Sequence, residues 1–266
     1  MSRILIIGDS WGCGEWNYLC PDSLLPLGEN WHQAESLYCV SHRGLQKYLS
    51  DYGCYVHNLS KGKGSNMQAL KYLDPVGPNG PSEDAGRCYD YVFWFVTDPL
   101  RDHKVTSGIE AHTKEQIIRS IDHYMDLALA RANRIAQKHH FKTGIHVIGG
   151  LYSPSIEQID KYEYIHEGCL NFMKLIYSEM PEGFQGLASL PRYSDTDVVN
   201  RKLNNISDVI GSGAVDHLEF LQQTFRDISN NSEYFSVEND CHPDRFAHEI
   251  LFTYLKQRFK LTSYQG

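Results

Sequence analysis

Residues 3–12 carry a run of aliphatic side chains that stops at a Gly-Asp-Ser turn: Arg3-Ile4-Leu5-Ile6-Ile7-Gly8-Asp9-Ser10-Trp11-Gly12. A short apolar run bounded by turn residues is typical of a strand that is buried on both faces in a parallel sheet. In open α/β sheets, ligands bind beyond the carboxyl ends of the strands. The sequence therefore predicts that Ser10 lies at a ligand-binding edge.

Further apolar runs alternate with helical periodicity along the chain. We expect strands at residues 54–59, 91–96 and 144–148. Apolar residues at helical spacing predict helices at residues 33–51 (with a break near Ser41), 114–139, 162–180, 214–228 and 244–259, and residues 12–30 predict a long loop. Strands that alternate with helices and end in small residues indicate a doubly wound sheet. The predicted fold is a three-layer α/β/α, flavodoxin-like, mostly parallel sheet.

The length and charge of the chain limit its organisation and its partners. A chain of 266 residues can bury one large core, so we predict one domain over residues 1–266, with an insertion or lid at residues 151–213. The chain has 25 Lys and Arg against 33 Asp and Glu, a net charge of -8, and no basic run at either end. This charge argues against a nucleic acid or a membrane as partner and favours a neutral or weakly charged substrate. An oligomer or assembly into a virion is neither indicated nor excluded.

Cysteine usage and hydropathy bear on the location of the protein. The seven cysteines are an odd number and form no CxxC pair, so we expect reduced thiols rather than a disulfide framework or a zinc knuckle. The apolar run at residues 4–7 is too short for a signal peptide or a membrane span. We expect a cytoplasmic protein, or a virion-associated one if the chain is encoded by a phage.

A second polar segment, near the far end of the chain, completes a candidate catalytic set. It precedes a predicted helix and reads Asn239-Asp240-Cys241-His242-Pro243-Asp244. Acyl transfer by a serine requires a base within hydrogen-bond reach and a group that orients this base. Because a parallel sheet can bring both ends of the chain to one edge, we predict Ser10 as nucleophile, His242 as base and Asp240 as the group that orients His242.

The two segments together resemble the SGNH (GDSL-type) hydrolase family, whose nucleophile follows the first strand and whose base lies in a late Asp/His-Pro segment. The resemblance implies an esterase that acts on an acetylated carbohydrate or another short acyl ester, without a cofactor. The family usually places its Asp three residues before the His, where this chain has Asn239, and Asp240 lies only two residues before His242. We therefore expect either a Ser-His-Asp triad or a Ser-His dyad.

The resemblance also implies an oxyanion hole. Its donors correspond to the backbone N–H of Ser10, the backbone N–H of Gly64 (with Gly62 as the alternative register) and Thr97. The Gly-x-Asn-Asp block of the family falls on Phe95-Val96-Thr97-Asp98, so Thr97 stands in place of the Asn. Loss of one oxyanion donor typically lowers turnover by about 10²–10³. The change therefore predicts reduced activity, a donor supplied by Asn66, or a site without catalysis.

The same block resembles a divergent branch of the family found in bacteria and their viruses. In that branch a Thr or Ser followed by Pro and Arg replaces the Asn block, as in Thr97-Asp98-Pro99-Leu100-Arg101. We expect four residues near the nucleophile and the oxyanion hole to contact substrate: Asp9, Trp11, Asn66 and Arg101. The aromatic residues near the nucleophile turn either stack on sugars or pack the loop: Trp11, Trp16, Tyr18 and Trp31.

Three alternatives remain open from the residues. A metal site could use the pair His139-His140, or a set of Asp240, His242, Asp244 and His248, although a spacing of six residues between the last two histidines is poor for one helix face. A non-enzymatic protein could keep the fold and bind carbohydrate or serve as a structural subunit. A phosphate- or flavin-binding protein could use the glycines around Gly8 and Gly64, but the chain has no GxGxxG or Walker pattern.

Overall fold

The structure is a computed structural model of the whole chain. It describes residues 1–18, 38–62, 64–73, 89–97, 102, 114–150, 153–170, 172, 175–176, 243 and 245–263.

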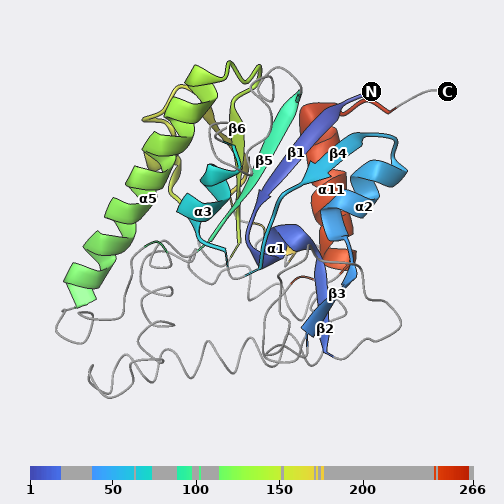
Figure 1. Cartoon of the computed structure of the whole chain (residues 1–266), viewed down its shortest axis with the longest axis horizontal. Coiled ribbons are helices and arrows are strands. Elements are labelled where there is room, and N and C mark those ends of the chain that lie inside the picture. Colours follow the sequence, from blue (N-terminus) through green and yellow to red (C-terminus); the bar gives the residue numbers. More distant parts are fainter. Residues whose placement is uncertain are drawn as a thin grey trace.

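Five parallel strands form the central sheet (Figure 1). They are β1 (Arg3–Gly8), β4 (Tyr55–Asn58), β5 (Tyr91–Val96), β6 (Ile145–Gly149) and β7 (Ile165–Cys169). The sheet order is β4-β1-β5-β6-β7, with β1 paired to β4 on one side and to β5 on the other. In chain order this is 2-1-3-4-5, the order of flavodoxin-like doubly wound sheets. The fold class predicted from the sequence is confirmed.

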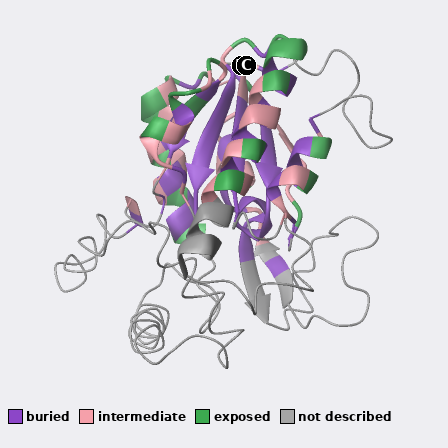
Figure 2. Ribbon diagram, turned by 90° about the vertical axis from the view of Figure 1, so that its left-hand side faces the viewer, coloured by how far each residue is buried: buried purple, intermediate pink, exposed green. Residues whose placement is uncertain are grey.

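Helices cover both faces of this sheet. They are α2 (Gly44–Asp51), α3 (Asn66–Lys71), α5 (Lys114–Lys138), α6 (Ile156–Ile159) and α11 (Arg245–Phe259). Because successive side chains of a strand point to opposite faces, Leu5 and Ile7 of β1 pack with α3 and α5, and Ile4 and Ile6 pack with α2 and α11. All four side chains are fully buried, which explains why this run has no polar residue. Figure 2 shows the buried strands between helices whose outer faces are exposed.

The strongest local patterns confirm several predicted elements. The strand predicted at residues 91–96 is β5, and the helix predicted at residues 114–139 is α5, one residue shorter. The turn at residues 51–53 ends α2 as expected, because Gly53 adopts φ +95, a conformation that L side chains rarely adopt. Ser65 caps α3 by accepting a hydrogen bond from the Gln68 backbone N–H at 3.2 Å.

The helix predicted at residues 33–51 and the loop predicted at residues 12–30 are both partly wrong. Residues Glu15–Tyr18 form strand β2, which pairs antiparallel with β3 (Tyr38–His42). The helix is therefore α2 alone, and it starts at Gly44, whose φ of +49 separates it from the strand. The pairing joins segments about twenty residues apart, so local periodicity could not reveal it.

The helix predicted at residues 162–180 is also wrong in its first part. Residues Ile165–Cys169 form β7, which pairs with β6 and carries an irregularity opposite Val147 and Ile148. Buried residues at both helical and strand spacing occur in this segment, and pairing with β6 decides between them. The segment that precedes β7 contains α6, which starts with a capping box in which Ser155 and Gln158 exchange hydrogen bonds.

Part of the region predicted as an insertion or lid belongs to the sheet, because β7 lies within residues 151–213. Residues 177–213 of this region, and the helix predicted at residues 214–228, lie outside the described residues. Within the described part of the chain, no helix combines the length and the apolar character needed to cross a bilayer.

His146 on β6 is a buried histidine in an aromatic environment. Its ring packs edge-on to Phe259 at 4.5 Å between centroids and lies 6.0 Å from the rings of Tyr91 and Phe93. Neither ring nitrogen has a hydrogen-bond partner among the described residues. Burial lowers the pKa of His146 to about 3, and the nearby His166 and Arg258 act in the same direction.

This histidine is expected to make the fold sensitive to acid. The unfolded chain takes up the His146 proton below about pH 6.5, whereas the folded chain takes it up only near pH 3, so acid favours unfolding. The free energy of unfolding should fall by about 1.4 kcal/mol for each pH unit below 6.5 on account of this group. Urea unfolding at about pH 7.5 and at about pH 5 should show a lower free energy of unfolding at the lower pH. In the His146→Phe variant this difference between the two pH values should be smaller by about 2 kcal/mol. His123→Gln, a change at an exposed position on α5, is the control and should show the same fall in the free energy of unfolding as the wild type. A fall as large as the wild type's in the His146→Phe variant would contradict this account.

Candidate active site

The Gly-Asp-Ser turn lies at the carboxyl end of β1, which runs between β4 and β5 in the sheet. Gly8 adopts φ +145, and a Cβ there would lie 2.6 Å from the Cβ of Phe95 on β5, so only glycine fits. Ser10 then begins the single-turn helix α1 (Ser10–Cys13), with the side chain 9% exposed. Ser10 therefore follows β1 at the carboxyl-end edge of the sheet, where α/β proteins bind ligands.

Asp9 has a structural role in this turn. Its Oδ1 accepts a hydrogen bond from the Trp11 backbone N–H at 3.0 Å, which caps α1. Its backbone oxygen accepts from the Gly12 N–H at 3.1 Å and from the Cys13 thiol at 3.5 Å. Burial, and secondarily the Asp9 carboxylate, raises the pKa of Cys13, so this thiol stays protonated and is a poor nucleophile.

The segment after β4 runs beside the same turn. The backbone N–H of Lys61 donates to the Gly8 oxygen at 3.0 Å, and Asn58 donates through Nδ2 to the Gly12 oxygen at 2.8 Å. Gly64 closes a tight turn, with its own N–H donating to the Lys61 oxygen at 3.1 Å. The predicted oxyanion donor thus lies close to the end of β1, and its N–H is engaged with Lys61. The backbone of Gly62, the alternative donor, lies near the thiol of Cys13 and acts to lower its pKa, against the larger effect of burial.

Thr97 follows β5 and is tied to the start of α3. Asn66 accepts a hydrogen bond from the Thr97 N–H at 2.9 Å and donates through Nδ2 to the Thr97 oxygen at 2.8 Å. Both side chains are buried. An asparagine amide carries two N–H donors, and the bond to Thr97 uses one of them. Asn66 therefore joins the predicted third donor to the loop that bears Gly64.

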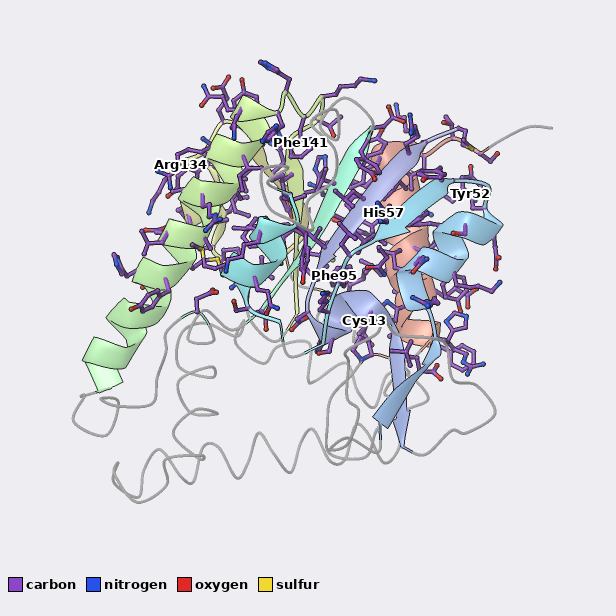
Figure 3. All side chains as sticks on the ribbon, in the orientation of Figure 1. Cys13, Tyr52, His57, Phe95, Arg134 and Phe141 are labelled. Atoms are coloured by element: carbon purple, nitrogen blue, oxygen red, sulfur yellow. The ribbon has the colours of Figure 1, made fainter. Side chains whose placement is uncertain are left out.

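Phe95 occupies the position where the SGNH block has glycine. A Cβ at Gly12 would lie 3.2 Å from Phe95 Cδ2, so the phenyl ring fills the space left by the glycines of the nucleophile turn. Figure 3 shows Phe95 and Cys13 near one another at this edge of the sheet. The ring of Phe95 is thus accommodated by Gly8 and Gly12 in the facing turn.

Trp11 packs in the core. Its side chain is 4% exposed and lies edge-on to Phe172, at 5.9 Å between ring centroids. A Cβ at Gly150, after β6, would lie 3.0 Å from the indole ring. This packing favours the structural role of Trp11 over stacking on a sugar. The side chains of Trp16 and Tyr18, and the whole of Trp31, lie outside the described residues.

The residues predicted to complete the site, Asp240, His242 and Arg101, lie outside the described residues. The described chain resumes just after His242, with Pro243 and α11. The first residue of α11, Arg245, donates its backbone N–H to the Glu15 carboxylate at 2.8 Å. Glu15 directly follows Gly14, which ends α1. The helix that follows His242 therefore starts beside the turn that contains Ser10.

His248 on α11, part of the alternative metal set, lies in an apolar setting. The ring is fully buried, 5.9 Å from Phe172 and 6.5 Å from Phe95 between centroids. Among the residues whose placement the structure describes, no group of three or more His, Cys, Asp or Glu side chains could hold a metal ion. The other members of the set, Asp240, His242 and Asp244, lie outside those residues.

A scan against protein-family models finds no match, and a search of curated proteins finds no significant match. Solved structures that match over nearly the whole chain include a lipase/acylhydrolase from Enterococcus faecalis, at 13% identity and a TM-score of 0.39, covering 100% of both chains. A protein described as a GDSL-like lipase from Parabacteroides merdae is 12% identical, with a TM-score of 0.42 and coverage of 98% of this chain and 96% of the other. A family two carbohydrate esterase from Cellvibrio japonicus is 12% identical, with a TM-score of 0.38 and coverage of 98% of this chain and 61% of the other.

Sequence reasoning missed three contacts that shape this edge: Asn58 with Gly12, Asn66 with Thr97, and Glu15 with Arg245. Each joins segments separated by at least 31 positions. The available signal in the sequence was that Asn58, Asn66 and Glu15 each stand close to a glycine. The sequence does not show which group such a side chain contacts in the folded protein.

Proposed function

We propose that this protein is a serine esterase of the SGNH type, in which Ser10 is the nucleophile and His242 the base. The observation that carries the proposal is the position of Ser10 at the carboxyl end of β1, flanked by the segments of Gly64 and Thr97. Neighbouring strands β4, β1 and β5 supply these three segments. Acyl transfer needs a nucleophile beside hydrogen-bond donors, and the segments of Gly64 and Thr97 are the proposed source of those donors.

In the proposed reaction, Ser10 Oγ attacks the ester carbonyl carbon while His242 takes the hydroxyl proton. The tetrahedral oxyanion is stabilised by the Ser10 N–H and by donors from Gly64 and Thr97, and Asp240 orients His242. Collapse breaks the bond to the alcohol, which leaves with the proton from His242. Water then attacks the acyl-enzyme, with His242 again as base, and releases the acid.

The proposed substrate is a short acyl ester, with an O-acetyl group on a carbohydrate as the favoured case. The proposal rests on the SGNH resemblance and on the aromatic residues that follow the nucleophile turn in the sequence, Trp16, Tyr18 and Trp31. The net charge of -8 agrees with a substrate that is neutral rather than anionic.

A second candidate is an SGNH-type protein with weak or no catalysis that binds carbohydrate or serves as a structural component, such as part of a virion. Two observations favour it: the Gly64 N–H is bonded to Lys61, and the Asn66 amide is bonded to the backbone of Thr97. The Gly64 N–H would have to share or exchange its bond to reach an oxyanion, and the Asn66 amide has one N–H besides the one bonded to Thr97.

The test is hydrolysis of p-nitrophenyl esters and of acetylated xylan by the purified protein. We expect turnover of p-nitrophenyl acetate, slower turnover of longer acyl chains, and no effect of a chelator, because no step uses a metal. Absence of turnover together with measurable glycan binding would support the second candidate. Loss of turnover on chelation would contradict the serine mechanism.

A further inference from the structure

We infer that the ion pair between the buried Glu15 and the exposed Arg245 holds the base-bearing segment in register with the nucleophile turn. The inference rests on the proposed function and assigns Glu15 and Arg245 as positioning residues of that site. Glu15 lies five residues after Ser10, and Arg245 lies three residues after His242. A link between these two residues therefore bears on both halves of the proposed catalytic pair.

The pair is a three-point contact. Glu15 Oε2 accepts from the Arg245 backbone N–H at 2.8 Å and from Nε at 2.9 Å, and Glu15 Oε1 accepts from Nη2 at 2.9 Å. The Glu15 side chain is only 5% exposed. A paired fork of this kind fixes both distance and orientation, and a buried carboxylate that loses its partner is strongly disfavoured.

A second contact lies one turn further along α11. A Cβ at Gly44 would lie 2.6 Å from His248 Cδ2 and 2.8 Å from the Cα of Gly14, so the ring, the start of α2 and the end of α1 meet closely. Gly14 itself adopts φ +122 against the backbone of residues 42–44. The first two turns of α11 are thus held against the residue that ends α1.

The rest of α11 does not need this pair to dock. Its apolar face is fully buried through Ala247, Leu251 and Leu255. Its far end is held by a hydrogen bond from the Tyr91 hydroxyl to the Phe259 oxygen at 3.1 Å. Packing fixes the helix on the sheet, whereas the Glu15 contact fixes where its first residue lies.

The fixed position of Arg245 restricts where His242 can lie, because the two residues are only three positions apart in the sequence. Three residues span at most about 11 Å, so the position of Arg245 limits the space open to the imidazole. A displacement of about 1 Å between catalytic groups can lower turnover by about 10². The pair therefore acts on the chemical step through His242 and does not touch the substrate.

The far end of the same helix offers a matched control. Arg258 Nη2 contacts Glu167 Oε2 at 3.2 Å, and both side chains are partly exposed. Arg258→Lys alters an Arg–Glu pair between α11 and the sheet without reaching the nucleophile turn. Arg245→Lys keeps the charge of Arg245 but removes the fork, and Glu15→Gln keeps the side-chain size but removes the negative charge.

The experiment measures kcat and KM for p-nitrophenyl acetate, the rate of Ser10 labelling by a fluorophosphonate, and hydrogen exchange in residues 9–15 and 245–251, at a temperature where every variant is folded. We expect Arg245→Lys and Glu15→Gln to lower kcat and the labelling rate together by about 10–100-fold, with little change in KM. Exchange should become faster in both segments. Arg258→Lys should change none of these quantities.

The outcomes separate this inference from the proposed function. Unchanged kcat, labelling and exchange in Arg245→Lys would overturn the inference and leave the esterase intact. A lower fraction of folded protein with unchanged kcat per folded molecule would also overturn it, because the pair would then be only structural. A wild-type chain that neither turns over esters nor reacts at Ser10 would overturn the proposed function, and hydrogen exchange would still show whether Glu15 and Arg245 hold the two segments together.

Discussion

Replacing Ser10 by alanine is expected to lower ester hydrolysis by at least about 10³-fold, because the variant lacks the atom that attacks the carbonyl carbon. The fold should be unaffected. Asp9, not Ser10, caps α1 through the Trp11 N–H, and alanine is a good residue for a helix. The measurement is kcat for p-nitrophenyl acetate, with the thermal unfolding midpoint recorded for both proteins.

The control for this prediction is Ser50→Ala, which removes an exposed hydroxyl on α2. It should leave both turnover and the unfolding midpoint unchanged. Full turnover in the Ser10→Ala protein would show that another group carries the reaction. Loss of turnover with a large fall in the unfolding midpoint would instead point to a damaged nucleophile turn, and would not support a nucleophilic role.

The second large effect is expected for His242→Gln, which should lower kcat/KM by about 10²–10⁴, the usual contribution of a general base. Glutamine keeps a polar side chain but cannot take up the Ser10 proton. In the wild type, kcat/KM should fall on the acid side, where the imidazole becomes protonated, and the variant should lack this dependence. His123→Gln, at an exposed position on α5, is the matched control and should retain the wild-type profile.

The same measurement tests which residue orients the imidazole. We expect Asp240→Asn to lower kcat by at least about ten-fold, because the carboxylate fixes the tautomer and stabilises the imidazolium. Asn239→Ala should have little effect. A larger effect of Asn239→Ala than of Asp240→Asn would mean that Asn239, three residues before His242, orients the imidazole. Wild-type activity in both the Asp240→Asn and the Asn239→Ala variant would indicate a Ser-His dyad.

The sequence was most informative for segments whose secondary structure follows from their own residues. The runs that became β1 and β5 are uniformly apolar because helices cover both faces of the sheet, and their lengths fit strands. The helical spacing of apolar residues continues over the whole of α5, so the helix can be predicted from this segment alone. From these elements and their order, the doubly wound fold and the edge that carries Ser10 follow by general rules of topology.

The errors lie where partners distant in the sequence decide the structure. Strands β2 and β3 exist because each pairs with the other, and β7 exists because it extends the sheet beyond β6. A segment such as Ile165–Cys169 satisfies helical and strand spacing alike, so its environment decides. Pattern reading has no access to that environment.

The site shows the same division. The Gly-Asp-Ser turn is a local pattern, and its position after the first strand could be predicted. The link between Asn66 and Thr97, and the contact of Glu15 with Arg245, depend on backbone groups that folding brings together. The position of Phe95 beside the nucleophile turn is explained by the space at Gly8 and Gly12.

The central claim is that the Ser10 hydroxyl is activated for attack, and covalent labelling tests it most directly. Wild-type protein would be treated with a fluorophosphonate, digested, and analysed by mass spectrometry to locate the adduct. The account predicts one phosphonyl group per chain, on Ser10, with loss of ester turnover in proportion to labelling. An adduct on a different serine, or full turnover in protein that remains unlabelled, would contradict it.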